Sequence, residues 1–262
     1  MHWLAGRLAV VTGASRGIGA ATATAVAAAG AHVVLAARDH QGLDGVAGRI
    51  KDAGGQATPR PTDVSDESAV ERLFAEVAGM GRLSALVCAA GVLTPAPFAG
   101  TTPAMWRETL EVNLTGAFLC CRAAFTAMVR SGEGRMVNIA SLSGVYATEK
   151  FPGLAAYNVS KYGVIGLTEA IAVEGREHGI SAICLSPGAV DTEMLRRANP
   201  ALRPGLTPDD VAELIVALLD SPLAPASGAN IPLFSNAPLL PSNPTLRHRP
   251  QIGAVVGSVR CV

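Results

Sequence analysis

Short apolar runs rich in β-branched residues alternate with longer alanine-rich runs along most of this chain. The short runs have the length of strands, and the longer ones have the length and spacing of helices. Parallel strands need a crossover between them, which is usually a helix, so the alternation predicts a parallel sheet. Strands are expected at Leu8–Thr12, His32–Ala36, Ala57–Pro61, Ala85–Cys88, Arg135–Ile139, Ser181–Leu185 and Asn230–Phe234.

The alanine-rich runs predict helices on both faces of that sheet. They are expected near Gly17–Ala29, Gly42–Ala53, Glu67–Met80, Pro103–Arg130, Ala155–Glu177 and Pro208–Leu219. The helix Pro103–Arg130 should bend near Asn113–Gly116, because Asn and Gly are poor interior helix residues. The predicted fold is a single α/β, doubly wound domain with a seven-stranded parallel sheet.

Composition excludes several classes of protein. The 262 residues are 49% hydrophobic and 16% charged, which suits a buried sheet and excludes a disordered chain. Lys+Arg and Asp+Glu both count 21, so neither a nucleic-acid partner nor an acidic membrane surface is indicated. No apolar run reaches the ~18 residues of a membrane span without Arg, Glu, Gly or Pro. Because the N-terminus runs directly into the first strand, no signal peptide is expected.

The five cysteines have no metal-binding or disulfide spacing. Cys88 and Cys184 fall in strand-like runs, and Cys120 and Cys121 fall in a helical one. This set indicates reduced core thiols, a cytoplasmic protein and no metal site.

A change of composition marks the C-terminal end. After Ser235 the chain contains Pro238, Pro241, Pro244 and Pro250, which do not permit a continuous helix or an inner strand. The domain is therefore expected over residues 1–235, followed by a tail, 236–262, that is mobile or extended along a neighbouring surface.

The first strand ends in a glycine-rich turn, TGASRGIG, which leads directly into a helix. A helix N-terminus offers unpaired N–H groups and a positive dipole, so a tight turn there can bind a pyrophosphate. The turn could also be only a strand–helix connection, but its place after the first strand favours a dinucleotide. Its candidate cofactor residues are Gly13, Ser15, Arg16, Gly17, Ile18 and Gly19.

The second strand carries a clue to the choice of dinucleotide. Its end reads Ala36–Ala37–Arg38, where an NAD-binding chain would have an acidic residue for the ribose 2′-hydroxyl. Arg38, helped by Arg16, can bind a 2′-phosphate instead, which favours NADP(H) over NAD(H). Arg38 could also be solvated or paired with Asp39.

Tyr157 and Lys161 are the candidate reactive pair, because they lie four residues apart in a predicted helix and so share one face. A phenol has a pKa near ~10 in water. An ammonium ~4 Å away contributes roughly 4 kcal/mol at a dielectric of ~20, enough to lower the pKa of Tyr157 toward working pH. The same spacing also fits two surface residues of an amphipathic helix.

Taken together, these segments resemble the short-chain dehydrogenase/reductase family, and within it the 3-oxoacyl-(acyl carrier protein) reductase-like group. The resemblance covers about Arg7 to Phe234. It rests on TGASRGIG, Asp63–Val64, EVNLTGAF, NIASLSG, YNVSK and SPGAVDT, in that order. It implies a Rossmann-type fold, NAD(P) as cofactor and a small-molecule carbonyl or alcohol substrate. It also implies a homodimer or homotetramer built on the two longest helices.

The resemblance assigns roles to further residues. Tyr157 would be the general acid or base, and Lys161 would lower its pKa and hold the nicotinamide ribose. Ser141 would donate to the substrate oxygen, and Asn113 would place a water that connects Lys161 to solvent. The remaining cofactor contacts would be Asp63, Val64, Ala90, Gly91, Pro187, Gly188, Val190 and Thr192.

A purely structural role remains an alternative for several of these residues. Ser141 could belong to a turn, with Ser143 as the reactive serine; Asn113 and Asp63 could be helix caps. Val190–Leu206 would be the substrate lid, whose arginines either bind an anion or are solvated.

Two segments depart from the family pattern. Cys88–Ala89–Ala90–Gly91 replaces Asn-Asn-Ala-Gly, which predicts a looser site, and IPLFSN replaces the closing Asp-Gly-Gly segment. The function expected is an NADP(H)-dependent carbonyl reductase or alcohol dehydrogenase. An NAD-linked dehydrogenase and a catalytically idle dinucleotide sensor are the alternatives.

Overall fold

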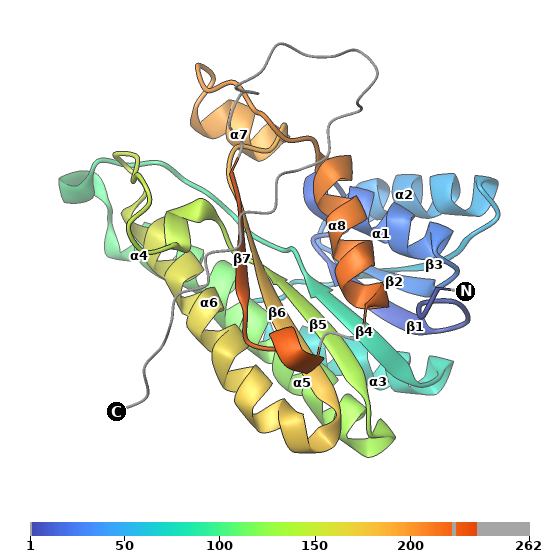
Figure 1. Ribbon diagram of the computed structural model, residues 1–262. Helices are drawn as coiled ribbons and strands as arrows, with labels where there is room; N and C mark the ends of the chain where they lie inside the picture. Colours follow the sequence, from blue (N-terminus) through green and yellow to red (C-terminus); the bar gives the residue numbers. More distant parts are fainter. Residues whose placement is uncertain (1, 222–223, 235–262) are drawn as a thin grey trace, which may run out of the picture.

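The computed structural model describes residues 2–221 and 224–234, and it contains one parallel sheet between two layers of helices (Figure 1). The strand order is β3-β2-β1-β4-β5-β6-β7. The strands are β1 Leu8–Thr12, β2 His32–Ala37, β3 Gln56–Pro61, β4 Leu83–Cys88, β5 Gly134–Ile139, β6 Ile180–Pro187 and β7 Asn230–Leu233. The predicted α/β fold with seven parallel strands is confirmed, and no strand end differs from its predicted position by more than two residues.

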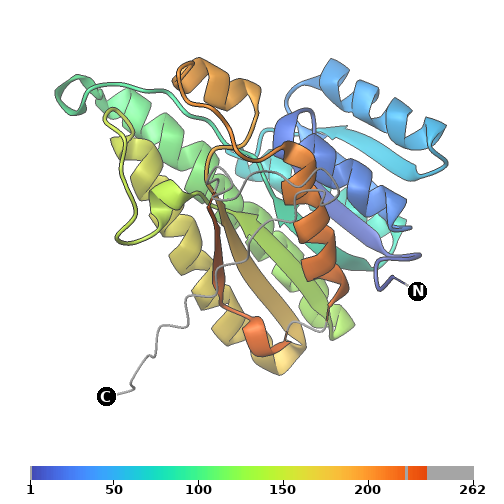
Figure 2. The same cartoon turned by 45° about the horizontal axis from the view of Figure 1, so that its top comes forward.

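The helices divide between the two faces of the sheet. They are α1 Gly17–Ala28, α2 His40–Asp52, α3 Glu67–Met80, α4 Pro103–Leu110, α5 Gly116–Ser131, α6 Ala155–Gly175, α7 Glu193–Ala198 and α8 Pro208–Asp220. Helices α1, α2 and α8 cover one face, and α3, α5 and α6 cover the other (Figures 1 and 2). The strand period of two explains this division, because Ala9 and Val11 of β1 face the first layer while Leu8 and Val10 face the second.

The predicted bend in the long helix is confirmed. A π-helical turn, Glu111–Thr115, separates α4 from α5 and contains Asn113. Such turns insert an extra residue into a helix and occur often at functional sites. Here the turn directs the Asn113 side chain toward the loop that follows β4, as described below.

The same stretch bears on the expectation about membrane spans. Pro103–Ser131 is long and apolar enough to cross a membrane by length and composition, with a mean hydropathy of 1.4. It nevertheless contains Gly116 and Arg122, and its apolar inner face packs against β4 and α3. The apolar composition thus belongs to a core helix of this domain.

One helix was not predicted. α7, six residues long, lies within the segment expected to be the substrate lid. The Thr192 side chain caps it by accepting from the Leu195 N–H at 3.2 Å.

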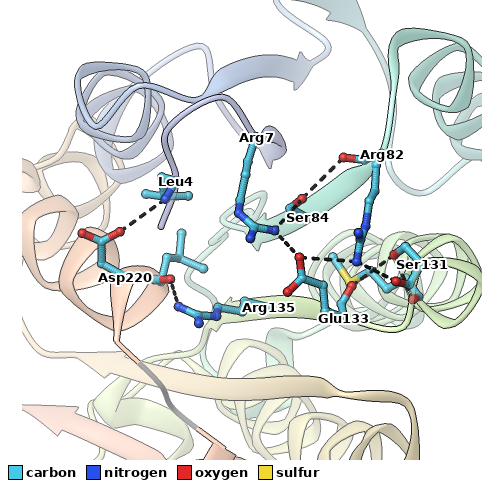
Figure 3. A network of polar contacts seen from close by, with 10 residues as sticks. Leu4, Arg7, Arg82, Ser84, Ser131, Glu133, Arg135 and Asp220 are labelled. Atoms are coloured by element: carbon cyan, nitrogen blue, oxygen red, sulfur yellow. Dashed lines mark hydrogen bonds and ion pairs between the residues drawn. The ribbon is translucent and has the colours of Figure 1, made fainter. Parts of the chain in front are cut away.

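A cluster of charged residues closes the amino ends of the strands, opposite to the glycine-rich turn (Figure 3). Arg7, just before β1, and Arg82, just before β4, both contact the Glu133 carboxylate, which lies just before β5. The hydrogen bond from Arg7 lowers the pKa of Glu133. Arg135 donates to the carbonyl oxygen of Leu219 at the end of α8. These contacts tie three strands and α8 together at the edge remote from the candidate site.

Candidate active site

A cavity of about 2000 Å³ opens along the carboxyl ends of the strands. The carboxyl edge of a parallel sheet is where such folds bind ligands, because loops from several strands meet there. Every predicted cofactor residue lines this cavity, as do Ser141, Tyr157 and Lys161. Asn113 does not line it and lies buried behind its wall.

The glycine-rich turn brings backbone segments so close together that side chains are excluded. A Cβ on Gly13 would lie 2.8 Å from the Ala89 carbonyl, and Gly13 has a φ of +66°. A Cβ on Gly19 would lie 2.2 Å from the carbonyl oxygen of Gly13. No side chain caps the start of α1, so its N–H groups remain available to a phosphate. The turn therefore fits the pyrophosphate of a dinucleotide.

Thr12 connects this turn to the loop after β4. Its hydroxyl accepts hydrogen bonds from the backbone N–H groups of both Ala89 and Ala90, each at 3.2 Å. The sequence predicted a looser site here, because Cys88 and Ala89 replace two asparagines. In the structure this side chain from the neighbouring strand supplies a tie between the two strand ends.

Tyr157 and Lys161 lie on one face of α6, and both line the cavity. The Lys161 ammonium lies 5.6 Å from the centre of the Tyr157 ring. It donates a hydrogen bond of 2.8 Å to the carbonyl oxygen of Ile139, the last residue of β5. Lys161 is only 5% exposed, and this burial lowers its pKa to about 8.

The expected effect of Lys161 on Tyr157 is not found in this structure. Burial raises the pKa of Tyr157, and only a hydrogen bond with the Ser141 side chain opposes that rise. The physical reason is that burial disfavours the charged phenolate, and this outweighs the influence of Ser141. Tyr157 is therefore a neutral phenol at neutral pH, as it would be in water.

Ser141 is both the predicted turn residue and the partner of Tyr157. Its hydroxyl accepts from the Ser143 N–H at 3.1 Å, which starts the short 3₁₀ turn Leu142–Gly144. The same side chain lowers the pKa of Tyr157, in opposition to burial. Ser143 also lines the cavity, but this interaction with Tyr157 favours Ser141 as the serine of the pair.

Asn113 is not a helix cap. Its amide forms a pair of hydrogen bonds with the backbone of Val92, accepting at 2.7 Å and donating at 3.0 Å, and it also donates to Ser160 Oγ at 3.1 Å. A Cβ on Gly91 would lie 3.4 Å from the Asn113 Oδ1 and 3.7 Å from the Lys161 Nζ. Asn113 thus fixes the loop after β4 next to Lys161 and joins it to α6.

Two arginines lie at the end of the cavity next to β2. Arg38 is 3.8 Å from Asp63, and Arg16 is 3.0 Å from Glu193 and 3.8 Å from Asp39. The alternative pairing of Arg38 with Asp39 is wrong, because Asp39 caps α2 through the Gly42 N–H. Asp63 accepts from Ser65, and Asp66 is the cap of α3. Both arginine side chains are 61% exposed, so they remain accessible to a ligand.

The remaining predicted cofactor residues come from two other loops. Val64, Ala90 and Gly91 follow β3 and β4, whereas Pro187, Gly188, Val190 and Thr192 follow or end β6. Gly188 donates to the carbonyl oxygen of Leu233 at 2.8 Å, which joins this loop to β7. Thr192 lies beside the glycine-rich turn, since its Cγ2 would be 3.4 Å from a Cβ on Gly17.

Comparison with known proteins identifies the family. The family model described as short chain dehydrogenase matches residues 7–203. The chain belongs to this family. The short-chain dehydrogenase fold, the cavity at its carboxyl edge and the Ser141, Tyr157 and Lys161 cluster agree with the predicted resemblance.

Several relatives of this short-chain dehydrogenase are similar along most of their length. The cis-4-hydroxycyclohexanecarboxylate dehydrogenase of Sinomonas cyclohexanicum is 38% identical over 224 residues, covering 81% of this chain and 88% of the relative. The 3-oxoacyl-(acyl-carrier-protein) reductase of Synechocystis sp. is 34% identical over 234 residues, covering 86% and 93%. A solved 3-oxoacyl-(acyl-carrier-protein) reductase from Agrobacterium tumefaciens C58, with NADP bound, superposes with a TM-score of 0.81 at 28% identity, covering 89% and 95%.

Sequence reasoning missed the loop between Ser141 and Tyr157 of this short-chain dehydrogenase. Tyr146, Phe151 and Leu154 of that loop line the cavity. Two aromatic residues so close to the YNVSK motif were the available signal. Glu193, whose contact with Arg16 joins α7 to the glycine-rich turn, was also missed. Among the described residues, no cluster of His, Cys, Asp and Glu could hold a metal ion.

Proposed function

We propose that this chain is an NADP(H)-dependent carbonyl reductase or secondary-alcohol dehydrogenase with Tyr157 as its general acid or base. The observation that carries this proposal is that Ser141, Tyr157 and Lys161 line one cavity, with the Lys161 ammonium 5.6 Å from the centre of the Tyr157 ring and Ser141 acting on the pKa of Tyr157. Family membership supports the reaction class, because relatives are named as dehydrogenases and reductases. The preference for NADP(H), the roles of single residues and the substrate are parts of the proposal.

The cavity fits a dinucleotide on the evidence of its backbone. The two glycine positions that exclude a Cβ, Gly13 and Gly19, leave room for a pyrophosphate beside the uncapped start of α1. Arg38 and Arg16 would hold the 2′-phosphate, because a guanidinium binds phosphate with charge-assisted, paired hydrogen bonds. Their present carboxylate partners form exposed ion pairs, and such pairs are weak. The nicotinamide, when bound, supplies the hydride chemistry.

The protein's own contribution is the control of one proton. Tyr157 is a neutral phenol at neutral pH, so its hydroxyl has a proton to give to the oxygen of a ketone. Ser141 donates a second hydrogen bond to the oxygen as negative charge develops there. Lys161 carries the nearest ammonium and would stabilise the phenolate that remains. In the direction of alcohol oxidation the same phenolate would act as the base.

Lys161 would also take part in returning a proton from solvent to Tyr157 after each reduction. Its ammonium lies next to Gly91, whose loop is fixed by Asn113. We therefore keep Asn113 as a positioning residue for a water that connects Lys161 to solvent. Both N–H groups of the Asn113 amide are used by Val92 and Ser160, whereas its oxygen accepts one hydrogen bond, from Val92, and has capacity for a second.

The location and the oligomeric state of the enzyme are also parts of the proposal. The four cysteines within the described residues, Cys88, Cys120, Cys121 and Cys184, are buried and free, which supports a cytoplasmic location; Cys261 lies outside the described residues. Exposed apolar residues on α5 and α6, among them Phe118, Val159 and Val173, support a homodimer or homotetramer formed through these helices.

Cofactor consumption tests the proposal directly. Purified protein is incubated with NADPH or NADH and a panel of ketones, 3-oxoacyl thioesters, steroids and sugars. The expected result is oxidation of NADPH with at least one ketone, and Tyr157→Phe should lower that rate by about 10²–10⁴-fold while cofactor affinity stays unchanged. A Tyr162→Phe variant, whose hydroxyl contacts the carbonyl oxygen of Val145 outside the reactive pair, is the matched control.

The outcomes separate the alternatives. Faster turnover with NADH would favour the NAD-linked dehydrogenase. Tight binding of a dinucleotide without turnover of any ketone or alcohol would favour the idle sensor. Near-normal turnover by Tyr157→Phe would exclude Tyr157 as the proton donor.

A further inference from the structure

The cavity has two ends of different chemical character. The cofactor end is formed by the glycine-rich turn and the loops after β2 and β3, and it carries Arg16 and Arg38. The loop that precedes α6 lies on the far side of α7 from α2 in Figures 1 and 2, and it belongs to the other end. There the cavity is lined by the segment after Gly91, by the loop before α6, by α7 and by Phe234. This second end is called the substrate end below.

Large apolar side chains at the substrate end remain exposed to solvent. Tyr146 is 87% exposed, Phe234 is 44%, Phe151 is 40% and Met194 is 37%. They come from three separate segments and line the same cavity, together with the apolar Leu93. Large apolar surfaces gathered in a concave site indicate a ligand that covers them. The matching ligand has an apolar body.

The loop that carries Tyr146 is held in a strained conformation. The next residue, Ala147, has a φ of +58°, which is unfavourable for a residue other than glycine. Lys150 holds the loop, because its ammonium donates to the carbonyl oxygens of Leu142 and Val145 and to the Thr148 hydroxyl, at 3.2, 2.6 and 2.7 Å. Strain that the surrounding contacts maintain is typical of binding sites. Here it keeps Tyr146 at the rim of the substrate end.

Every cation at the substrate end already has an oxygen partner nearby, as far as the described residues show. Lys150 has three donors and uses all three inside its own loop. The two arginines of α7 are engaged as well: Arg196 pairs with Asp191, and Arg197 lies 2.5 Å from Glu193. The sequence had left open whether these arginines bind an anion or are solvated. In the structure both are largely exposed and each lies beside a carboxylate, so their two positive charges are matched by two negative ones.

Two carboxylates without such partners line the cavity. Glu108 on α4 and Glu149 in the loop before α6 are exposed and form no ion pair with any residue in the described part of the chain. A carboxylate on the substrate would face these charges and the apolar surfaces described above. Both effects disfavour its binding, since burying a charge without a partner is costly.

We infer that the substrate is an uncharged ketone or secondary alcohol with a bulky apolar body, and that the site discriminates against substrates carrying a carboxylate. This inference rests on the proposed function and adds a substrate class to it. It also separates this chain from the relative named as a cis-4-hydroxycyclohexanecarboxylate dehydrogenase.

Three cyclohexanones that differ only at carbon 4 test the inference. The group there is tert-butyl, carboxamide or carboxylate; the amide matches the carboxylate in shape but lacks its charge. Each compound is assayed as a substrate, and its binding to the full-length Tyr157→Phe protein saturated with NADPH is measured by calorimetry. The tert-butyl ketone should bind most tightly, and the carboxylate should bind at least about tenfold more weakly than it.

Substitutions test which residues of the cavity disfavour the carboxylate compound. Glu149→Gln or Glu108→Gln should strengthen binding of the carboxylate by about two- to fivefold, the range of an exposed charge interaction, with little effect on the tert-butyl ketone. Glu71→Gln on α3, an exposed glutamate outside the cavity, should change neither. Tyr146→Ala should weaken binding of the tert-butyl ketone more than that of the carboxylate.

Measuring binding and turnover separately distinguishes failure of this inference from failure of the proposed function. Carboxylate binding as tight as that of the amide, or tighter, overturns the inference even if ketones are reduced. Binding in the expected order without turnover of any compound in the wild-type protein supports the inference about the site and contradicts the proposed reaction. Absence of binding by all three compounds overturns the inference.

Discussion

Lys161 donates its hydrogen bond to the carbonyl oxygen of Ile139, so the ammonium of α6 is fixed to the last residue of β5. This bond compensates part of the cost of burying a charge, yet the pKa of Lys161 is still lowered to about 8. The lowered pKa shows that the buried charge destabilises the folded state. The enzyme thus keeps a destabilising residue where the proposed chemistry needs it.

A first prediction concerns stability against pH. Between pH 8 and the ordinary lysine value of 10.5, the unfolded chain binds a proton at Lys161 that the folded chain has lost. The free energy of unfolding of the wild type, relative to Lys161→Met, should therefore rise by up to about 3 kcal/mol across this window. Urea unfolding at several pH values measures the difference. Lys51→Met, at an exposed position on α2, is the control and should show no such trend. A flat difference for Lys161→Met would mean that its ammonium is well solvated.

A second prediction concerns cofactor choice. Arg38→Asp should weaken NADPH binding by about ten- to a hundredfold, because charge-assisted hydrogen bonds to the 2′-phosphate are lost, and should improve NADH binding. Titration of both cofactors into both proteins gives the result. Arg49→Asp, on an exposed face of α2 outside the cavity, controls for the change of net charge. Equal NADPH binding by Arg38→Asp and wild type would leave Arg38 as a partner of Asp63 only.

A third prediction concerns the two hydrogen bonds by which Thr12 joins the end of β1 to the loop after β4. Thr12→Val keeps the shape of the side chain but removes the oxygen that accepts from Ala89 and Ala90. Two N–H groups then lose their partner, and we expect a loss of about 1–3 kcal/mol in the free energy of unfolding, together with weaker dinucleotide binding. Thr12→Ser retains the hydroxyl and should recover most of both properties. If both variants behave alike, the hydroxyl is not the tie.

A fourth prediction concerns the domain boundary proposed at residue 235. The strand β7 ends at Leu233 and completes the seven-stranded sheet, so truncation after Ser235 should leave folding and activity intact. The predicted tail, 236–262, lies outside the described residues. Light scattering and a cofactor assay on the truncated protein check the boundary, and loss of folding or activity would place the tail within the core.

The fold could be predicted from the sequence because its signals are local. All strands except β3, which reads QATPRP, are short and mostly apolar runs, and the weakened helix at Asn113 and Gly116 became the π-helical turn. α7 escaped prediction because six residues in a segment rich in proline and arginine give almost no periodic signal.

The candidate site also has features that local sequence signals predict and features that depend on tertiary packing. Motif spacing placed Ser141, Tyr157 and Lys161 in one cavity, since each is fixed by its own strand or helix. The partner of the Lys161 ammonium could not be foreseen, because the carbonyl of Ile139 reaches it only through packing of α6 on the sheet. The pairing of Arg38 with Asp63 likewise depends on β2 and β3 lying side by side.

The strand order has a consequence for synthesis of the chain on the ribosome. β1 is made first, but it lies in the middle of the finished sheet, and one of its two neighbours is β4. All five residues of β1 are buried when the protein is complete. Until the ribosome has passed Cys88, one edge of this apolar strand has no partner, and such an edge invites pairing with other chains. The nascent chain therefore carries an unpaired apolar strand edge during the interval when its glycine-rich turn has been synthesised but β4 has not.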